Sequence, residues 1–150
     1  MSKAETFIQS WMSHRQALLE LLERLSDEHL NFRPWEKGMS LSELVLHISA
    51  SSEMFSTIVQ TGSFKQPASH EVNSVSELKQ VVQAETDDTK NKIAPLSDEH
   101  LEQTAEFNGM KMSGAAMLEM LKEHEIHHKG QLFTYARLIG IQELPFFISR

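Results

Sequence analysis

Apolar side chains recur every three or four residues in four segments of the chain, and no segment shows a sustained alternation of apolar and polar positions. A repeat of this length places the apolar residues on one face of a helix. The spacing therefore predicts four amphipathic helices, over about residues 4–25, 40–60, 74–93 and 113–139. In a chain of 150 residues, four such helices predict an all-α fold, a four-helix bundle, that forms a single domain over residues 1–150.

The predicted helix boundaries carry local signals. Ser40 with Glu43, and Ser74 with Glu77, have the spacing of a capping box, in which the two side chains take up free backbone N–H groups. Gly62 follows the second helix and suits the left-handed residue that often ends one. The connections after the first and third helices are long for a simple bundle, on the order of 15–18 residues, so we expect at least one of them to be a crossover.

A short pattern occurs twice. Ser26-Asp-Glu-His-Leu30 recurs as Ser97-Asp-Glu-His-Leu101, and Gly38-Met39 recurs at the same offset as Gly109-Met110. The shared offset favours duplication of a helix–loop–helix half, with the two halves related by a pseudo-two-fold axis. The alternative is a chance similarity between loops that are both rich in helix-capping residues.

Charge and composition exclude several classes of protein. The chain has 14 basic and 21 acidic residues and a net charge of −7, which makes it a poor ligand for a phosphate backbone. It has no cysteine, which excludes disulfides, thiolate metal ligands and a cysteine nucleophile. It has neither a signal-peptide pattern nor an apolar stretch of membrane-spanning length. We therefore expect a cytoplasmic protein with no nucleic-acid or membrane partner.

The fourth predicted helix carries two histidines four residues apart on its apolar stripe. The predicted stripe comprises Met117, Leu121, His124, His128, Gln131, Tyr135 and Leu138. His124 and His128 lie one turn above each other, so their imidazoles can converge on one ion. His47 lies on an inward-facing stripe of the second helix, and packing of that helix against the fourth would bring it to the same point.

Three imidazoles that face an apolar core lose hydration and need a partner, which a divalent cation supplies. Three histidine ligands leave at least one coordination position open, which is typical of a catalytic site. The ion would lower the pKa of a bound water to roughly 7, or bind a substrate thiolate. Zinc and nickel both suit such a site, so the metal is open between them. The chain has no phosphate-binding loop, nucleophile elbow or H-E-x-x-H motif, so no general base is assigned.

Four residues near these histidines are candidates to orient a ligand or to face the substrate. Glu43 precedes His47 by one turn and could orient it, although its capping role already accounts for it. His127 leaves the predicted stripe, so it supports a ligand, faces the substrate or is exposed. Gln131 and Tyr135 share the stripe of the two histidines.

Other polar and aromatic residues have simpler assignments. We expect a solvated face that comprises Glu119, Glu123 and Glu125. We expect surface or loop positions for His14, His29, His70 and His100. We expect the cavity between the helices to be lined by residues such as Trp11, Trp35, Met54 and Tyr135. None of these residues enlarges the predicted ligand set.

Two parts of the chain resemble a known family. Residues Leu25–Pro34 and Met39–His47 resemble the first half of the DinB-like (DinB/YfiT) superfamily, and Leu121–Leu132 with Tyr135–Gly140 resembles its second half. The match spans about residues 4–146, and the string around the H-x-x-x-H spacing is its most specific part.

The resemblance implies a bundle of up-down-down-up order with a long crossover between helices two and three. It implies a divalent metal ion, nickel or zinc, held by His47, His124 and His128, whereas His127 matches an extra histidine that is not usually a ligand. It also implies a homodimer and a small-molecule substrate. Relatives include S-transferases that use bacillithiol or mycothiol, and metal-dependent hydrolases.

Three functions stay open on these grounds, and two of them are enzymatic. The first is a metal-dependent transferase that joins a low-molecular-weight thiol of the bacillithiol type to a small electrophile. The second is a non-catalytic, metal-stabilised bundle that binds a small molecule or a partner, and the third is a hydrolase that uses a metal-bound hydroxide. The apolar tail over residues 145–148 either docks on a second subunit or packs on its own bundle.

Overall fold

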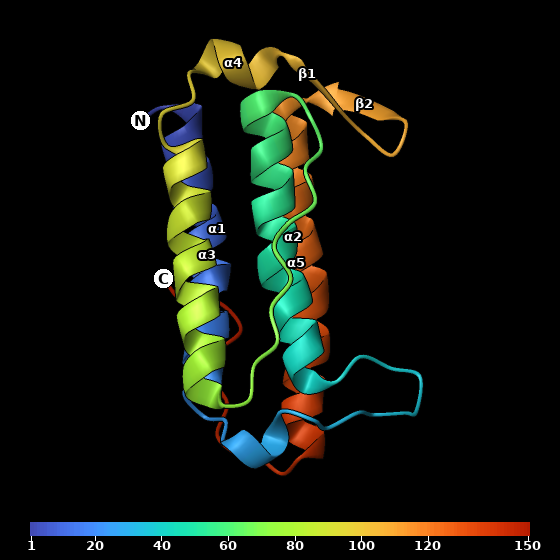
Figure 1. Cartoon of the computed structure of the whole chain (residues 1–150). Coiled ribbons are helices and arrows are strands. Elements are labelled where there is room, and N and C mark those ends of the chain that lie inside the picture. Colours follow the sequence, from blue (N-terminus) through green and yellow to red (C-terminus); the bar gives the residue numbers. More distant parts are fainter.

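Four long helices run side by side in the computed structural model, which describes all residues 1–150 (Figure 1). They are α1 (Lys3–Leu22), α2 (Leu41–Thr61), α3 (Val75–Ile93) and α5 (Gly114–Leu138). Helices α1 and α5 run in one direction and α2 and α3 in the other, which confirms the up-down-down-up four-helix bundle. Helix α2 packs against α3 and α5, and α1 packs against the same two helices, so α1 and α2 lie diagonally opposite.

The helix ends follow the local signals in the sequence with one difference. Ser40 Oγ accepts from the Glu43 N–H and Glu43 returns a carboxylate to the Ser40 N–H, which completes the predicted capping box. Ser74 caps α3, but the Glu77 carboxylate accepts from the Asn73 N–H instead, so that predicted box is only half formed. None of the helices is long and apolar enough to cross a membrane.

The crossover is the segment 62–74, which runs along the outside of α2 and joins it to the parallel helix α3 (Figure 1). Gly62 starts it in a left-handed conformation, with φ of 82°. The connections after α1 and α3, which we expected to include a crossover, are not crossovers. They are long because they contain short elements of secondary structure. The first contains the short helix η1 (Asp27–His29), and the second contains α4 (Asp98–Glu102) and a β-hairpin.

The hairpin is an element that the helical periodicity does not predict. Strands β1 (Thr104–Phe107) and β2 (Met110–Ser113) pair antiparallel, with Phe107 opposite Met110. The two residues between them, Asn108 and Gly109, both have positive φ, of 51° and 79°. Positive φ at both positions is the geometry of a type I′ turn, which matches the twist of paired strands. The hairpin packs beside α2 and brings Phe107 to that helix.

The two copies of the repeated pattern begin alike and then diverge. Ser26 precedes η1 and Ser97 precedes α4, so each copy starts a short helical segment. Only the second copy continues into a hairpin, where Gly109 takes a positive φ that Gly38 does not have. The two loops are therefore alike only in their first turns, although each still joins two long helices, and the duplication stays a prediction.

The apolar core is divided into two clusters by a polar layer at the middle of the bundle. One cluster is centred on Leu18, Leu44 and Leu132, and the other on Trp11 and Ile58. Each long helix contributes polar side chains to the layer between them. Its members, all at most 2% exposed, are Arg15 of α1, Ser52 of α2, Thr86 and Thr89 of α3, and Glu125 of α5.

Arg15 and Glu125 form the centre of this polar layer. Arg15 Nε donates to Glu125 Oε2 and one terminal nitrogen donates to Oε1, both at 2.8 Å. The other terminal nitrogen donates to Thr86 Oγ1 at 2.7 Å, and the Trp11 indole N–H donates to Glu125 Oε1 at 2.8 Å. Each charge is thus both neutralised and hydrogen-bonded, which is the condition for burying an ion pair.

The solvated position predicted for Glu125 is wrong, although Glu119 and Glu123 are exposed as expected. Met117 and Leu121 are buried as predicted. From His124 onward the inward face is turned by one residue, or about 100°, from the predicted stripe, and its buried residues are Glu125, Lys129, Leu132 and Ala136. His124 and His128 consequently lie half-buried on the flank of α5 instead of facing the core.

The C-terminal tail packs on its own bundle. The Ser149 N–H donates to the Ser13 carbonyl at 2.8 Å, and Lys129 Nζ donates to the Phe147 carbonyl. The rings of Phe146 and Phe147 still remain 70% and 56% exposed. The homodimer, which would cover such rings, stays a prediction.

Candidate metal centre

Three histidines from two adjacent helices meet on one side of the bundle. His47 lies on α2, where it is exposed instead of facing inward as predicted, and the half-buried His124 and His128 lie one turn apart on α5. One ring nitrogen from each of the three lies within 4.8 Å of the others. Nε2 of His47 and Nε2 of His124 are 3.1 Å apart. The structure therefore brings together the three side chains that the sequence singles out as a ligand set.

This arrangement fits a divalent transition metal. Two nitrogens that bind one zinc ion tetrahedrally, with bonds near 2.0–2.1 Å, lie about 3.3 Å apart, close to the separation of His47 and His124. The group consists of three imidazoles with no carboxylate. Nitrogen-only donor sets suit zinc and nickel and are poor for magnesium or calcium. The cluster therefore supports a site for a divalent transition metal ion.

The surroundings keep these rings in the form that binds metals. Burial, followed by the neighbouring His128 and His47 rings, lowers the pKa of His124 to about 4. Burial, followed by His128, also lowers the pKa of His47. Both rings are therefore neutral at pH 7, and a neutral imidazole offers a nitrogen lone pair to a cation.

Gln131 orients one of the three rings. Its side-chain oxygen lies 2.7 Å from Nδ1 of His128, one turn back along α5. An amide oxygen only accepts, so Nδ1 carries the hydrogen and Nε2 is left as the free lone pair. Gln131 thereby fixes both the tautomer and the direction of the His128 ring.

We expect the substitution Gln131→Met to lower zinc affinity by about 10- to 100-fold, because the His128 ring would then lose conformational freedom when it binds the ion. Gln131→Glu keeps an acceptor oxygen and should retain the wild-type affinity within a few fold. Competition with a chromophoric chelator measures both values. An unchanged affinity in the methionine variant would rule out this role for Gln131.

Two of the other candidates, Glu43 and His127, lie outside the three-histidine group. The Glu43 carboxylate accepts from the Ser40 N–H and pairs with Arg33 at 2.6 Å, and these contacts account for it fully. The backbone N–H of Ser40 is the main reason that the pKa of Glu43 is lowered. His127 is exposed, and its ring contacts that of His128 at a centroid distance of 4.7 Å, outside the three-histidine group.

A cleft of about 960 Å³ opens beside the three-histidine group, and His47 and His124 line it. Met54 lines this cleft as expected, but the other predicted lining residues do not. Trp11 is buried in the core, and Trp35 is 61% exposed on the loop before α2. Tyr135 donates its hydroxyl to the Met39 carbonyl at 3.0 Å, so it anchors the loop that borders the cleft.

The residues that sequence reasoning missed are three phenylalanines of the cleft wall. Phe55 comes from α2, Phe64 from the crossover and Phe107 from β1. The Asn108-Gly109 pair, a strong hairpin signal, was the clue that could have placed Phe107 beside the site. No local signal places Phe64, because its position depends on the path of the crossover.

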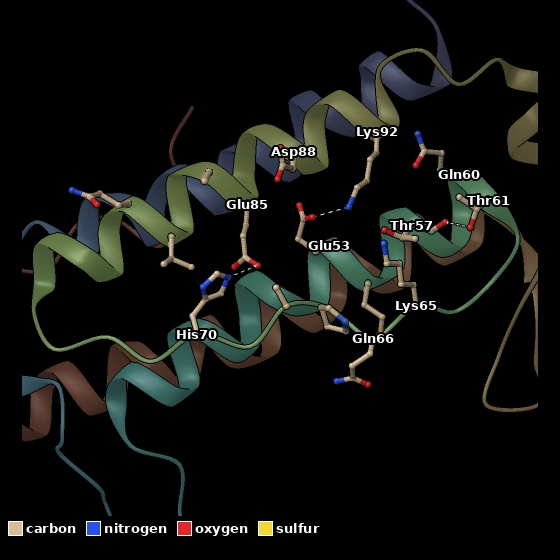
Figure 2. Close-up of a pocket in the computed structure, with 16 residues that line it drawn as sticks. Glu53, Thr57, Gln60, Thr61, Lys65, Gln66, His70, Glu85, Asp88 and Lys92 are labelled. Atoms are coloured by element: carbon tan, nitrogen blue, oxygen red, sulfur yellow. Dashed lines mark hydrogen bonds and ion pairs between the residues drawn. The ribbon is translucent and has the colours of Figure 1, made fainter.

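A second cavity, of about 830 Å³, lies between α2, α3 and the crossover (Figure 2). Glu53 pairs with Lys92 there at 2.7 Å, and His70 reaches from the crossover to within 3.9 Å of Glu85. Glu85 is only 7% exposed, and burial raises the pKa of its carboxyl group. None of the three clustered histidines lines this cavity, but it adjoins the cleft beside them. The residues that line both are Met54, Gln66, Pro67, Ala68 and His70.

The fold and the site together define a class of protein: a four-helix bundle with three convergent histidines beside a cleft. Comparison with known proteins identifies the family. The model of the DinB family matches residues 1–149. The chain therefore belongs to the DinB family.

Individual relatives agree with this assignment. YjoA of Bacillus subtilis (strain 168) is 33% identical over 153 residues, covering 100% of this chain and 99% of that protein. The crystal structure of the DinB-like protein YjoA superposes with a TM-score of 0.86 at 34% identity, over 97% of this chain and 99% of that chain. A DinB-like protein from Bacillus cereus ATCC 10987 gives a TM-score of 0.79 at 21% identity over 95% of each chain, which shows the fold alone.

Proposed function

We propose that this protein is a divalent-metal-dependent S-transferase that joins a low-molecular-weight thiol, of the bacillithiol type, to a small electrophile. The observation that carries the proposal is the group of three ring nitrogens within 4.8 Å of one another, two of whose residues line a cleft. Three protein ligands leave a coordination position for a substrate atom, unlike the four ligands of a closed structural site.

The bound zinc or nickel ion would act as a Lewis acid that lowers the pKa of a thiol at the open position. His47, His124 and His128 would hold and position the ion, and Gln131 would keep His128 in the tautomer that binds it. The chain has no cysteine that would compete with a substrate thiol for the metal.

The surroundings favour sulfur transfer over hydrolysis. No carboxylate belongs to the three-histidine group, and the nearby Glu43 is engaged by Ser40 and Arg33. Hydrolysis benefits from a positioned general base, whereas a thiol with a pKa near 8.5 loses its proton to solvent once that pKa is lowered. The open cleft gives that proton a direct path to water.

The reaction with an aryl chloride illustrates the proposed transfer. The thiol loses its proton to solvent, and its sulfur attacks the ring carbon. A sulfur–carbon bond forms, the carbon–chlorine bond breaks, and chloride leaves with the bonding electron pair. The products are a thioether, a proton and a chloride ion, and no oxidant or reductant is required.

The test is turnover of 1-chloro-2,4-dinitrobenzene with bacillithiol by zinc- or nickel-loaded protein. We expect thioether formation that depends on both metal and thiol and falls to the rate of metal-free protein in His124→Ala. The variant His127→Ala, which alters an exposed neighbour of the site, should keep the activity. A rate no higher than that of metal-free protein with every thiol tried would remove the proposal.

The other candidate functions are distinct outcomes of the same experiment. Cleavage of p-nitrophenyl acetate without thiol, in proportion to bound metal, would indicate a hydrolase. Loss of thermal stability on chelation, with neither activity present, would indicate a metal-stabilised binding bundle.

A further inference from the structure

The cleft beside the three histidines has two chemically different ends. Helix α2 runs along it, and at a rise of about 1.5 Å per residue Glu43 is displaced from His47 by about 6 Å along the helix axis in one direction and Met54 by about 10 Å in the other. The end around Glu43 carries the polar side chains of Asn31, Arg33 and Asn73 beside the apolar Met39 and Val72. The end around Met54 carries three aromatic rings, those of Phe55, Phe64 and Phe107. His47 therefore lies between an end that offers charged and amide groups and an end that offers aromatic rings.

The three phenylalanines form a continuous surface, here called the aromatic wall, that leads to the histidines. The rings of Phe55 and Phe107 meet edge to face with centroids 5.3 Å apart. Phe64 lies beside Phe107 at 6.5 Å, tilted by 32°. At the other end, the Phe55 ring lies 6.1 Å from the ring of His124. A group that packs on this wall thus extends directly from the candidate metal ligands.

The wall is uncovered at its outer end. Phe55 is 5% exposed at the base of the cleft, whereas Phe64 is 53% exposed at its rim. Apolar rings left accessible within a concave site lose contact with water when a ligand covers them, which favours binding. The three rings come from α2, β1 and the crossover, so both segments that distinguish this bundle from four plain helices contribute to the wall.

We propose that the aromatic wall binds an aromatic or extended apolar group of the substrate, while the atom that reacts lies at His47, His124 and His128. This inference rests on the proposed metal-dependent function and specifies its substrate class: an electrophile with an aryl or similarly apolar substituent. A small molecule fits this surface better than a protein partner does, because the wall and two of the histidines line the same concave cleft. Phe64 and Phe107 are then the specificity-determining residues.

The test uses two metal-binding probes that differ by one phenyl ring, phenylacetohydroxamic acid and acetohydroxamic acid. Each is titrated calorimetrically into zinc-loaded protein, with retention of zinc checked by metal analysis. We expect the phenyl compound to bind at least about tenfold more tightly, because burying the apolar surface of a phenyl ring contributes at least that factor to affinity. Phe64→Ala and Phe107→Leu should each reduce the ratio, and together should bring it close to one.

A matched control separates the wall from aromatic surface in general. Trp35→Ala removes an exposed ring that does not line the cleft, and the ratio should be unchanged. Equal affinities of the two probes for the wild type, or a preference that persists in the double variant, would overturn the inference. Phe64→Ala alters an exposed side chain, so it remains informative if the Phe107 variant does not fold.

The proposed transferase activity and the aromatic wall fail in different ways. A phenyl preference without turnover of any thiol would leave the wall in place and remove the transferase. Thiol turnover with no phenyl preference would support the transferase and overturn the binding role of the aromatic wall. A protein that retains no divalent metal would contradict both.

Discussion

Alanine in place of His124 is expected to weaken zinc binding by about 100- to 1000-fold, the loss that corresponds to one ligand of a tetrahedral site. Nε2 of His124 lies 3.1 Å from Nε2 of His47, and the three rings form a triangle with centroid distances of 4.9, 4.8 and 4.5 Å. Removing His124 leaves two ligands on different helices. Competition titration against a chelator of known affinity, on protein purified without a histidine tag, measures the change.

The neighbouring histidine provides the control for this result. His127→Ala changes a ring on the same turn of α5 that lies outside the three-histidine group, and its zinc affinity should match that of the wild type. His47→Ala should resemble His124→Ala, because both remove a member of the group. Equal affinities for His124→Ala and His127→Ala would show that the three imidazoles do not act together.

Replacement of Arg15 by leucine is expected to lower the free energy of unfolding by about 3–5 kcal/mol. The guanidinium is fully buried, and its loss leaves the Glu125 carboxylate in the core with only the Trp11 N–H as a partner. An isolated buried charge is costly, whereas the pair is neutralised and hydrogen-bonded. Urea denaturation at pH 7 measures the effect.

The double variant Arg15→Leu/Glu125→Leu shows whether the loss of stability comes from an unpaired Glu125 carboxylate or from lost packing. If the cost of Arg15→Leu comes from the unpaired Glu125, adding Glu125→Leu should restore part of the stability, so the two changes should not be additive. Lys79→Met, which breaks an exposed ion pair with Glu23, should cost less than about 1 kcal/mol. A loss for Arg15→Leu no larger than that for Lys79→Met would contradict the role assigned to the polar layer.

The helices and the metal ligands could be predicted because their signals are local. The spacing of apolar residues placed all four long helices, and Ser40 with Glu43 marked the start of α2 through a cap that uses only neighbouring residues. The i, i+4 spacing of His124 and His128 sets their separation whatever the helix packs against. Only the approach of His47 depends on the packing of α2 against α5.

The predicted face of α5 was wrong from His124 onward because the buried stripe there contains charged residues. Glu125 and Lys129 are at most 3% exposed, and a stripe that includes them does not look apolar. Their partners belong to other segments: Arg15 on α1 for Glu125, and His14 with the tail carbonyl of Phe147 for Lys129. Helical periodicity cannot register such tertiary pairing, so it chose the neighbouring stripe that contains the histidines.

The aromatic wall could not be predicted from any one segment of the chain. Phe64 and Phe107 are brought together with Phe55 only by the path of the crossover and by the hairpin. The Asn108-Gly109 turn was the one available clue, and it specifies the hairpin but not the surface that the hairpin covers.

The polar layer has a consequence for the alignment of the helices along the bundle axis. Leucines tolerate a helix that slides by one turn, about 5.4 Å, because one apolar contact then replaces another. The Arg15 guanidinium can bond Glu125 and Thr86 in only one axial alignment of the helices. If α5 slid along the axis, the Glu125 carboxylate would lie among apolar side chains. Since Glu125 directly follows His124, the contact that prevents slippage also sets the height at which α5 presents its imidazoles to α2.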